Sequence, residues 1–262
     1  MPAPSSMNNQ PSTTRPRVSI VIATWNAAQT LERCVASIVG QRFVEWELLI
    51  SDGGSTDRTL DLIRQYENHI AWWHSENDDG IYDAWNRAIG HATGDYICFL
   101  GADDAWADIG ALERLFSAIG SDKYDLVTSR GLIFSPDSQE TTEFGAPWNF
   151  QRIGKRMVVC HPGLLHKRAI FDTYGLFDTC YRIAGDLEFL LRLPPDIETK
   201  DVATITVRVQ SGGISRKNFY KRLREQRDIL ARHPRFGAIR AYLIWLDRLW
   251  RYPVATLLRI PY

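Results

Sequence analysis

Polar side chains, most of them acidic, stand at the ends of the first four strands that the hydrophobic pattern predicts. They are, in chain order, Thr24 and Asn26, then Asp52, then Glu76 and Asp78, and finally Asp103 and Asp104. In open parallel sheets, ligands bind in the crevice outside the carboxyl ends of the strands. An acidic crevice binds a phosphorylated ligand through a divalent cation, and Mg²⁺ or Mn²⁺ accepts one or two carboxylates together with phosphate oxygens. The pattern predicts a nucleoside diphosphate with its cation, although each acid taken singly also suits a turn or a helix cap.

Two common phosphate-binding motifs are missing from the chain. No G-x-G-x-x-G follows the first strand, and no G-x-x-x-x-G-K-[ST] occurs. Their absence argues against a dinucleotide fold and against a P-loop. The segment TWNAAQT after the first strand also lacks the Gly-rich, basic loop expected of a nucleotidyltransferase that makes an activated sugar.

The elements that must position these side chains follow from the hydrophobic periodicity. Strand and helix alternate about every 25 residues, which predicts an α/β fold with a doubly wound, mostly parallel sheet flanked by helices. The predicted strands are Val18–Thr24, Trp46–Ser51, Ile70–Ser75 and Tyr96–Leu100. The predicted helices are Ala28–Gln41, Arg58–Tyr66, Gly80–Ala92 and Ile109–Ile119.

The alternation stops near Tyr124, and shorter elements follow without a linker between the two halves. We expect strands at Asp125–Thr128, Leu132–Phe134 and Ala203–Val209, and helices at Lys167–Tyr174 and Asp186–Leu193. The two halves are therefore predicted to form one continuous fold.

Composition excludes several classes of protein. The 262-residue chain has a net charge of +0, which argues against a general nucleic-acid binder. Its four cysteines are far apart and show no CxxC spacing, so buried free thiols in a reducing compartment are expected rather than zinc or disulfides. Residues 1–16 are rich in Pro, Ser, Thr and Asn and lack an apolar region, which predicts a disordered leader and not a signal peptide.

The neutral total conceals a basic C-terminal tail. Lys217–Tyr262 contains 11 Lys and Arg residues against 3 Asp and Glu, a net charge of +8, whereas the first 216 residues carry −8. The pattern predicts basic helices at Lys217–Arg232 and Arg235–Tyr252, separated by Pro234, and the second has an apolar face with Trp and Tyr. Such a helix suits an anionic membrane surface, and equally suits packing against the catalytic body or a second protomer.

Four segments, in this order, carry a resemblance to a known family. They are Thr24-Trp25-Asn26, "ISDGGSTDRT", "SENDDGIYDAWNRAIGHATGDYICFLGADD" and "HPGLLHKRAIFDTYGLFDTCYRIAGDLEFLLRL". Together they resemble the inverting family 2 glycosyltransferases of the GT-A fold, especially those that build bacterial exopolysaccharide or O-antigen, over about Arg17–Ser215. The resemblance implies transfer of a sugar from a nucleoside-diphosphate-sugar to a hydroxyl of a glycan linked to polyprenyl diphosphate. It also implies Mg²⁺ or Mn²⁺ as cofactor.

Matching positions give the expected site residues. By resemblance, Thr24, Asn26 and Asp52 bind base and ribose, and Asp78 and Asp83, with Arg87 nearby, border the nucleotide-sugar. Asp103 matches the last acid of the family's Asp-x-Asp motif, which meets the metal and the diphosphate. The first position of that motif is Gly101 here, so this chain departs from two-carboxylate chelation. That departure keeps open a second class of function, a non-catalytic sugar-nucleotide-binding or scaffold subunit of a glycan-assembly complex.

Asp186 in "AGDLEFLLRL" matches the family's catalytic base. Inversion needs one base, which removes the proton from the attacking acceptor hydroxyl. Asp186 also suits a helix N-cap, and Glu188 would point about 200° away from it around the helix. His161 in "CHPG" is expected to contact acceptor or diphosphate, or to be a hydrogen-bonded structural histidine. The glycines of Ser211–Ser215 suit a mobile lid or a turn.

The expected division of the chain has four parts. Residues 1–16 are the leader, residues 17–130 the nucleotide-sugar-binding half, residues 131–215 the acceptor and catalytic half of the same domain, and residues 216–262 the basic amphipathic tail. No run of 18 uncharged apolar residues occurs, so no membrane span is expected. The prediction is a cytoplasmic enzyme held peripherally at the inner face of the plasma membrane by residues 217–262, with no nucleic-acid partner.

Overall fold

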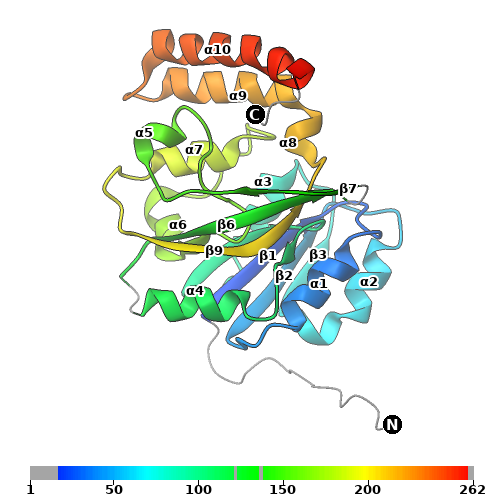
Figure 1. Ribbon diagram of the computed structural model, residues 1–262. Coiled ribbons are helices and arrows are strands. Elements are labelled where there is room, and N and C mark those ends of the chain that lie inside the picture. The colour runs from blue at the N-terminus through cyan, green and yellow to red at the C-terminus, as the bar shows by residue number, and fades with distance from the viewer. Residues whose placement is uncertain (1–16, 121–122, 136–137, 259–262) are drawn as a thin grey trace.

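The computed structural model describes residues 17–120, 123–135 and 138–258 (Figure 1). The strands are β1 (Val18–Thr24), β2 (Trp46–Asp52), β3 (Trp72–Ser75), β4 (Tyr96–Gly101), β5 (Ala105–Trp106), β6 (Leu126–Ser135), β7 (Ser138–Phe144), β8 (Leu165–Lys167) and β9 (Thr199–Gln210). The helices are α1 (Leu31–Val39), α2 (Thr59–Gln65), the 3₁₀ turn η1 (Glu67–His69), α3 (Ile81–Ile89), α4 (Ala111–Ile119), α5 (Phe150–Ile153), α6 (Ala169–Tyr174), α7 (Gly185–Arg192), α8 (Ile214–Lys217), α9 (Phe219–Arg232) and α10 (Gly237–Leu258). The predicted leader lies outside the described residues.

One sheet runs through the molecule in the order β3-β2-β1-β4-β8-β6-β9-β5, with β7 paired to β6. The first four strands are parallel, as expected from the alternating pattern. The short strands β8, β7 and β5 are antiparallel to their neighbours, so the sheet as a whole is mixed. The α/β fold with flanking helices and a C-terminal helical extension is confirmed.

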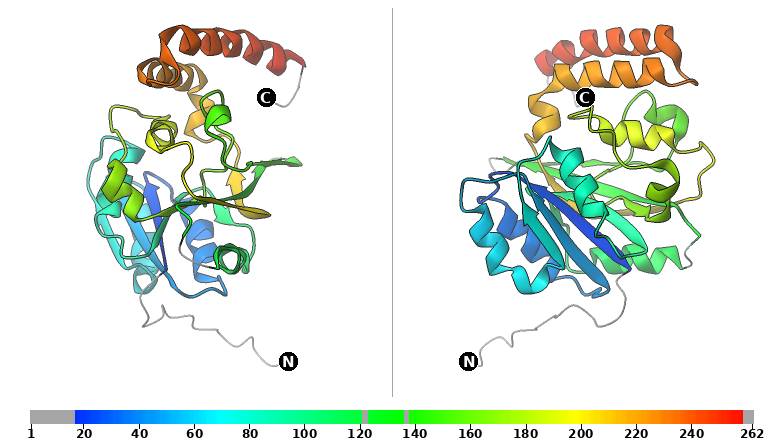
Figure 2. Two further views of the ribbon diagram at one scale, coloured as in Figure 1. Left: turned by 90° about the vertical axis from the view of Figure 1, so that its left-hand side faces the viewer. Right: turned by 180° about the vertical axis from the view of Figure 1, so that it is seen from behind.

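Both faces of the sheet are buried, which explains the nearly continuous apolar runs of β1 and β4. Ile20 and Ile22 of β1 pack toward α1, α2 and α4, whereas Val21 packs toward α3, α6 and α7. The right-hand view of Figure 2 shows α1 and α3 on opposite faces of the parallel strands. This packing holds the strands in a register that brings their ends level.

The register decides which polar residues meet. Thr24 is paired with Asp52, Asp52 with Ser75, and Ala23 with Gly101. The carboxyl ends of β1, β2, β3 and β4 therefore lie at one edge of the sheet, as the acidic pattern predicted.

The second half differs more from expectation. β6 is one strand of 10 residues, not two short ones, and β5, β7, β8 and α5 were not predicted. The polar segment through Ser129 and the glycine at 131 hide the continuity of β6. Ser129 is buried and bonds Thr206 across β9, and a Cβ on Gly131 would lie 2.5 Å from the ring of Phe144. Both residues are therefore set by long-range pairing that a local pattern does not reveal.

The tail folds into an antiparallel helical hairpin, α9 and α10, above α7 and α5 (Figures 1 and 2). The predicted helix from Lys217 is divided at Asn218 between α8 and α9, and the second helix extends further than expected, to Leu258. α9 buries Leu223, Ile229 and Leu230. No helix among the described residues is long and apolar enough to cross a membrane.

Candidate active site

Asp52 is the centre of a hydrogen-bond network that joins three strand ends. Its side chain is fully buried and accepts bonds from Thr24 Oγ1 (2.8 Å), Ser75 Oγ (2.7 Å) and Gly54 N (3.1 Å). Ser55 donates both its backbone N–H (2.8 Å) and its hydroxyl (2.5 Å). Burial alone would raise the pKa of Asp52, but the bonds from Ser55, Ser75 and Thr24 outweigh it and hold the pKa below its usual value. Asp52 and Thr24 thus join the carboxyl ends of β1, β2 and β3, and a direct contact with base or ribose stays a prediction.

Asn26 connects the loop after β1 to the loop after β2. Its Oδ1 accepts the backbone N–H groups of Thr56 (2.9 Å) and Asp57 (3.3 Å), and its own N–H donates to Ser55 Oγ (2.8 Å). Its φ of 48° lies in the left-handed region, which asparagine adopts more readily than most residues. The neighbouring Trp25 is 70% exposed, so its aromatic ring lies on the surface after β1. Trp25 was not among the predicted site residues.

The loop after β3 closes onto the loop after β2 because Gly53 has no side chain. A Cβ at Gly53 would lie 2.6 Å from Asp78 Oδ2. The other oxygen of Asp78 accepts the N–H of Gly80 at 2.8 Å, and Asp83 accepts from Arg87 Nη2, also at 2.8 Å. Asp78 and Asp83 are therefore fixed beside the strand ends, and Arg87 supports the second of them.

The two acids after β4 are in different surroundings. Asp104 is buried, and its two oxygens accept from Gly101 N (3.1 Å) and Gln210 N (3.3 Å). Burial and the charge of Asp103 raise the pKa of Asp104 to about 7. Asp103 is only half-buried. Asp104 therefore braces the turn, and Asp103 is the acid that can meet a ligand.

Gly101 lies directly against the two carboxylates of this turn. A Cβ at Gly101 would lie 2.7 Å from Asp103 Oδ1 and 2.9 Å from Asp104 Oδ2. An aspartate cannot occupy position 101 unless both carboxylates move. In this structure, the carboxylates of Asp103 and Asp104 both lie close to the position that a side chain at residue 101 would occupy.

Arg33 of α1 is a support that sequence reasoning missed. Its Nη2 donates to the carbonyl oxygen of Asp103 and to Oε1 of Gln210, both at 2.7 Å. Gln210 ends β9, just before the Ser211–Ser215 segment that was predicted to be a lid or a turn and whose last two residues begin α8. Arg33 therefore ties the Asp103 turn to the base of that segment. An exposed arginine in an amphipathic helix gave no signal of this role.

The residues present are compatible with a divalent cation, although they do not form a cage for it. Among the described residues, no group of three or more His, Cys, Asp or Glu side chains is arranged to hold a metal ion. Mg²⁺ and Mn²⁺ bound with a nucleotide commonly take one or two carboxylates, and phosphate and water supply the other ligands. The half-buried Asp103, next to the buried Asp104, is compatible with such a site.

Asp186 lies in the first turn of α7, as its predicted helix start required. Burial raises its pKa to about 6, although the N–H of Leu187 (2.8 Å), the hydroxyl of Tyr82 (3.3 Å) and the charge of Arg222 act in the opposite direction. Glu188 forms an ion pair with Arg192 (3.0 Å), and burial raises its pKa as well. A carboxylate with a pKa near 6 is ionised at neutral pH and is basic enough to accept a proton.

Tyr82 of α3 links Asp186 to the first half of the fold, which contains the Asp78–Asp83 segment. Its ring packs on Gly185, where a Cβ would lie 2.8 Å away, and its hydroxyl donates to Asp186. Arg182 adds a second connection through an ion pair with Asp79 (3.3 Å). The structure therefore brings Asp186 next to the Asp78–Asp83 segment. Tyr82 is also buried in the core, and it was not among the predicted site residues.

His161 is buried within an aromatic cluster. Its ring stacks on Phe99 (5.9 Å between centroids) and Trp85 (5.6 Å), and burial lowers its pKa to about 4. Its Nε2 has no hydrogen-bond partner among the described residues. His161 is thus a neutral histidine of the core with one polar atom left over, and its contact with acceptor or diphosphate stays a prediction.

Polar side chains at the carboxyl ends of β1 to β4, with Asp186 held next to the Asp78–Asp83 segment, are the arrangement expected of a glycosyltransferase of the GT-A type. The family model "Glycosyl transferase family 2" matches residues 19–168. The chain belongs to this family.

Named relatives agree with the assignment. The chain is 32% identical over 220 residues to a PGL/p-HBAD biosynthesis glycosyltransferase of Mycobacterium bovis, covering 79% of this chain and 84% of that one. It is 28% identical to an uncharacterized glycosyltransferase of Mycobacterium tuberculosis, covering 88% and 91% of the two chains. The protein is a glycosyltransferase.

Solved structures share the fold. S. aureus TarS (residues 1–349) matches with a TM-score of 0.66 at 18% identity, over 90% of this chain and 72% of that one. The mannosyltransferase PcManGT of Pyrobaculum calidifontis, in complex with GDP-Man and Mn²⁺, also gives 0.66, at 19% identity, over 94% and 74%.

Proposed function

We propose that the protein is a metal-dependent inverting glycosyltransferase that moves a sugar from a nucleoside-diphosphate-sugar to a hydroxyl of a lipid-linked glycan in bacterial polysaccharide biosynthesis. The observation that carries the proposal is the single carboxylate of Asp186, with its pKa raised to about 6, beside the Asp78–Asp83 segment. A relative named a PGL/p-HBAD biosynthesis glycosyltransferase and structural neighbours solved with UDP-GlcNAc or GDP-Man support it.

The chemistry follows from the carboxylate. The proton of the acceptor hydroxyl passes to Asp186, and the oxygen forms a bond to the anomeric carbon. The bond between that carbon and the diphosphate breaks on the opposite face, and its electron pair leaves with the diphosphate. A divalent cation held by Asp103 would offset the negative charge of the leaving diphosphate. Tyr82, whose pKa burial and the charge of Asp186 raise well above its usual value, stays protonated and keeps the base oriented.

Calorimetry tests the donor site. UDP and GDP are titrated into the protein with and without Mn²⁺, and into Asp103→Asn. We expect binding that depends on Mn²⁺ and is lost in Asp103→Asn. Asp108→Asn is the matched control. Asp108 follows β5 in the chain and pairs with Arg114 (2.7 Å). Equal affinity of wild type and Asp103→Asn in the presence of Mn²⁺ would remove the metal role of Asp103.

We propose further that the hairpin contacts an anionic membrane surface. Ile239, Leu243, Leu246 and Trp250 recur at helical spacing on α10 and are 52–81% exposed. Arg240 and Arg251 lie on one flank of this apolar stripe, and the tail as a whole is strongly basic. Exposed apolar residues beside cations suit the interfacial region of an anionic bilayer, where the charges meet phosphate headgroups.

Point substitutions test this contact better than truncation, since α9 also buries core residues. Leu243→Glu with Leu246→Glu is compared with Ile109→Glu, an apolar residue that is 52% exposed outside the hairpin. We expect the double variant to lose flotation with phosphatidylglycerol vesicles, and the control to retain it. Unchanged flotation of the double variant would reject the membrane contact.

A further inference from the structure

Glu225 of α9 reaches into the segment just before α7. Its carboxylate accepts the backbone N–H groups of three consecutive residues, Arg182 (3.1 Å), Ile183 (2.8 Å) and Ala184 (2.9 Å). Two of these bonds share one carboxylate oxygen. A hydrogen bond to a charged acceptor is stronger than a neutral one, so a side chain far along the chain fixes this backbone.

Arg182, Ile183 and Ala184 lie directly before the helix that carries Asp186. α7 begins at Gly185, and Asp186 is its second residue. Ala184, at the N-cap position, offers no side-chain cap, and its carbonyl accepts the N–H of Glu188 (3.1 Å). The orientation of the first turn, and with it that of Asp186, therefore depends on a backbone that Glu225 holds.

The same segment is held from its other side by the donor half. The side chain of Arg182 pairs with Asp79, and a Cβ at Gly80 would lie 3.2 Å from Arg182 Nη1. Residues 182–184 thus lie between α9 and the loop that borders the predicted nucleotide-sugar site. A displacement of this segment would change the distance between Asp186 and the reacting centre.

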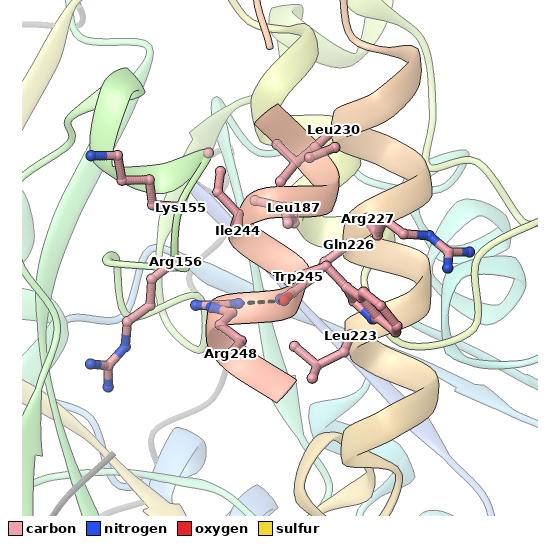
Figure 3. Close-up of a pocket in the computed structure, with 12 residues that line it drawn as sticks. Lys155, Arg156, Leu187, Leu223, Gln226, Arg227, Leu230, Ile244, Trp245 and Arg248 are labelled. Carbon is pink, nitrogen blue, oxygen red and sulfur yellow. Dashed lines mark hydrogen bonds between the residues drawn. The ribbon is translucent and has the colours of Figure 1, made fainter. Parts of the chain in front are cut away.

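Apolar packing holds α9 in place independently of Glu225. Leu223 and Leu230 of α9 lie with Leu187 of α7 and Ile244 of α10 around a narrow groove (Figure 3). Figure 3 also shows Arg248 bonded to Gln226, which ties α10 to α9. Removal of one carboxylate from α9 should therefore leave the hairpin docked.

We propose that Glu225 is a positioning residue, through which the C-terminal hairpin sets the orientation of Asp186 toward the acceptor hydroxyl. The inference rests on the proposed role of Asp186 as the base. Glu225 does not touch the reacting atoms in this assignment. It acts through the backbone of residues 182–184.

The test compares Glu225→Gln and Glu225→Ala with Asp228→Asn, a matched control one turn along the same helix that pairs with Arg227 (2.7 Å). The readout is Mn²⁺-dependent hydrolysis of UDP-GlcNAc and GDP-mannose, in which water replaces the acceptor. A misplacement of about 1 Å can reduce turnover on the order of 100-fold. We expect kcat to fall about 10- to 100-fold in Glu225→Ala and less in Glu225→Gln, which keeps one acceptor oxygen. The KM for the nucleotide-sugar and the kcat of Asp228→Asn should stay unchanged.

Two further measurements separate positioning from folding. The acid limb of the kcat–pH profile should move in the Glu225 variants, because the surroundings of Asp186 change, and hydrogen exchange should increase in residues 182–187 while residues 78–84 keep wild-type protection. If Glu225→Ala does not fold, Glu225→Gln carries the comparison. Wild-type kcat, pH profile and exchange in Glu225→Gln would overturn the inference. Wild-type turnover in Asp186→Asn would instead overturn the proposed function.

Discussion

The protein surrounds both Asp52 and Asp186, and it shifts their pKa values in opposite directions. Asp52 receives five hydrogen bonds from four residues, so its pKa is lowered despite complete burial. Asp186 receives a bond from Tyr82 and one from its own neighbour Leu187, and burial dominates, so its pKa is raised to about 6. At Asp52 the hydrogen bonds outweigh the effect of burial on the pKa, and at Asp186 burial outweighs the hydrogen bonds.

The difference shows how the two halves of the site are built. At the ends of the parallel strands, serine and threonine hydroxyls and backbone N–H groups converge on Asp52 and favour its charged form. At the start of α7, Asp186 has fewer donors, and its raised pKa is what the proposed role as a base requires.

The largest expected effect comes from removing the reactive carboxylate. Asp186→Asn keeps the shape of the side chain but cannot accept the hydroxyl proton, and general base catalysis contributes about 10²- to 10⁴-fold. We expect transfer to fall by that factor while nucleotide affinity stays unchanged, as measured by product formation and calorimetry. Glu188→Gln, on the same helix, is the control and should retain at least half of wild-type activity.

The pH dependence of wild-type activity tests the same role of Asp186 without a substitution. Only ionised Asp186 can act as base, and its pKa lies at about 6. The value of kcat/KM should therefore rise tenfold per pH unit below pH 6 and level off above it, up to the next ionisation. A profile that is flat between pH 5 and pH 7 would argue against Asp186 as the base.

The donor half was predictable from local pattern, and the catalytic half only in part. Val18–Thr24 was predicted to its exact ends, because a strand buried on both faces gives an unbroken apolar run. Asp52 and Asp103 were selected because the ends of parallel strands must lie together. Asp186 was selected by resemblance alone.

The supports that were missed share one physical reason. Arg33 lies 70 residues from Asp103, and Glu225 lies 41 residues from Ala184. Each acts on backbone atoms, which no side-chain pattern reports. The antiparallel strands β8 and β5, only two or three residues long, also depend on partners far along the chain.

Substitution of the charged carboxylate in the donor half should reduce stability. In Asp52→Asn, an amide N–H₂ faces hydroxyl and backbone donors, and the loss of such a buried network typically costs about 2–3 kcal/mol of unfolding free energy at pH 7. Since folding lowers the pKa of Asp52, its contribution is complete above the unfolded value of about 4 and is lost as pH falls through the folded value. The free energy of unfolding, measured in urea, should differ more between the variant and wild type at pH 7 than at pH 3.

In contrast to Asp52→Asn, Asp186→Asn should increase the free energy of unfolding, and this is the smallest of the expected effects. Because folding raises the pKa of Asp186 to about 6, the charged form is penalised in the folded state above that pH, and the folded protein gains relative stability as the carboxylate is protonated. An uncharged amide avoids the penalty, so we expect the variant to be about 1–2 kcal/mol more stable than wild type at pH 8, with the difference vanishing below pH 4. Urea unfolding of both proteins across this range measures it. A loss of stability at pH 8 would mean that the bonds from Tyr82 and Leu187 outweigh burial, and that Asp186, like Asp52, is held in place by its charge.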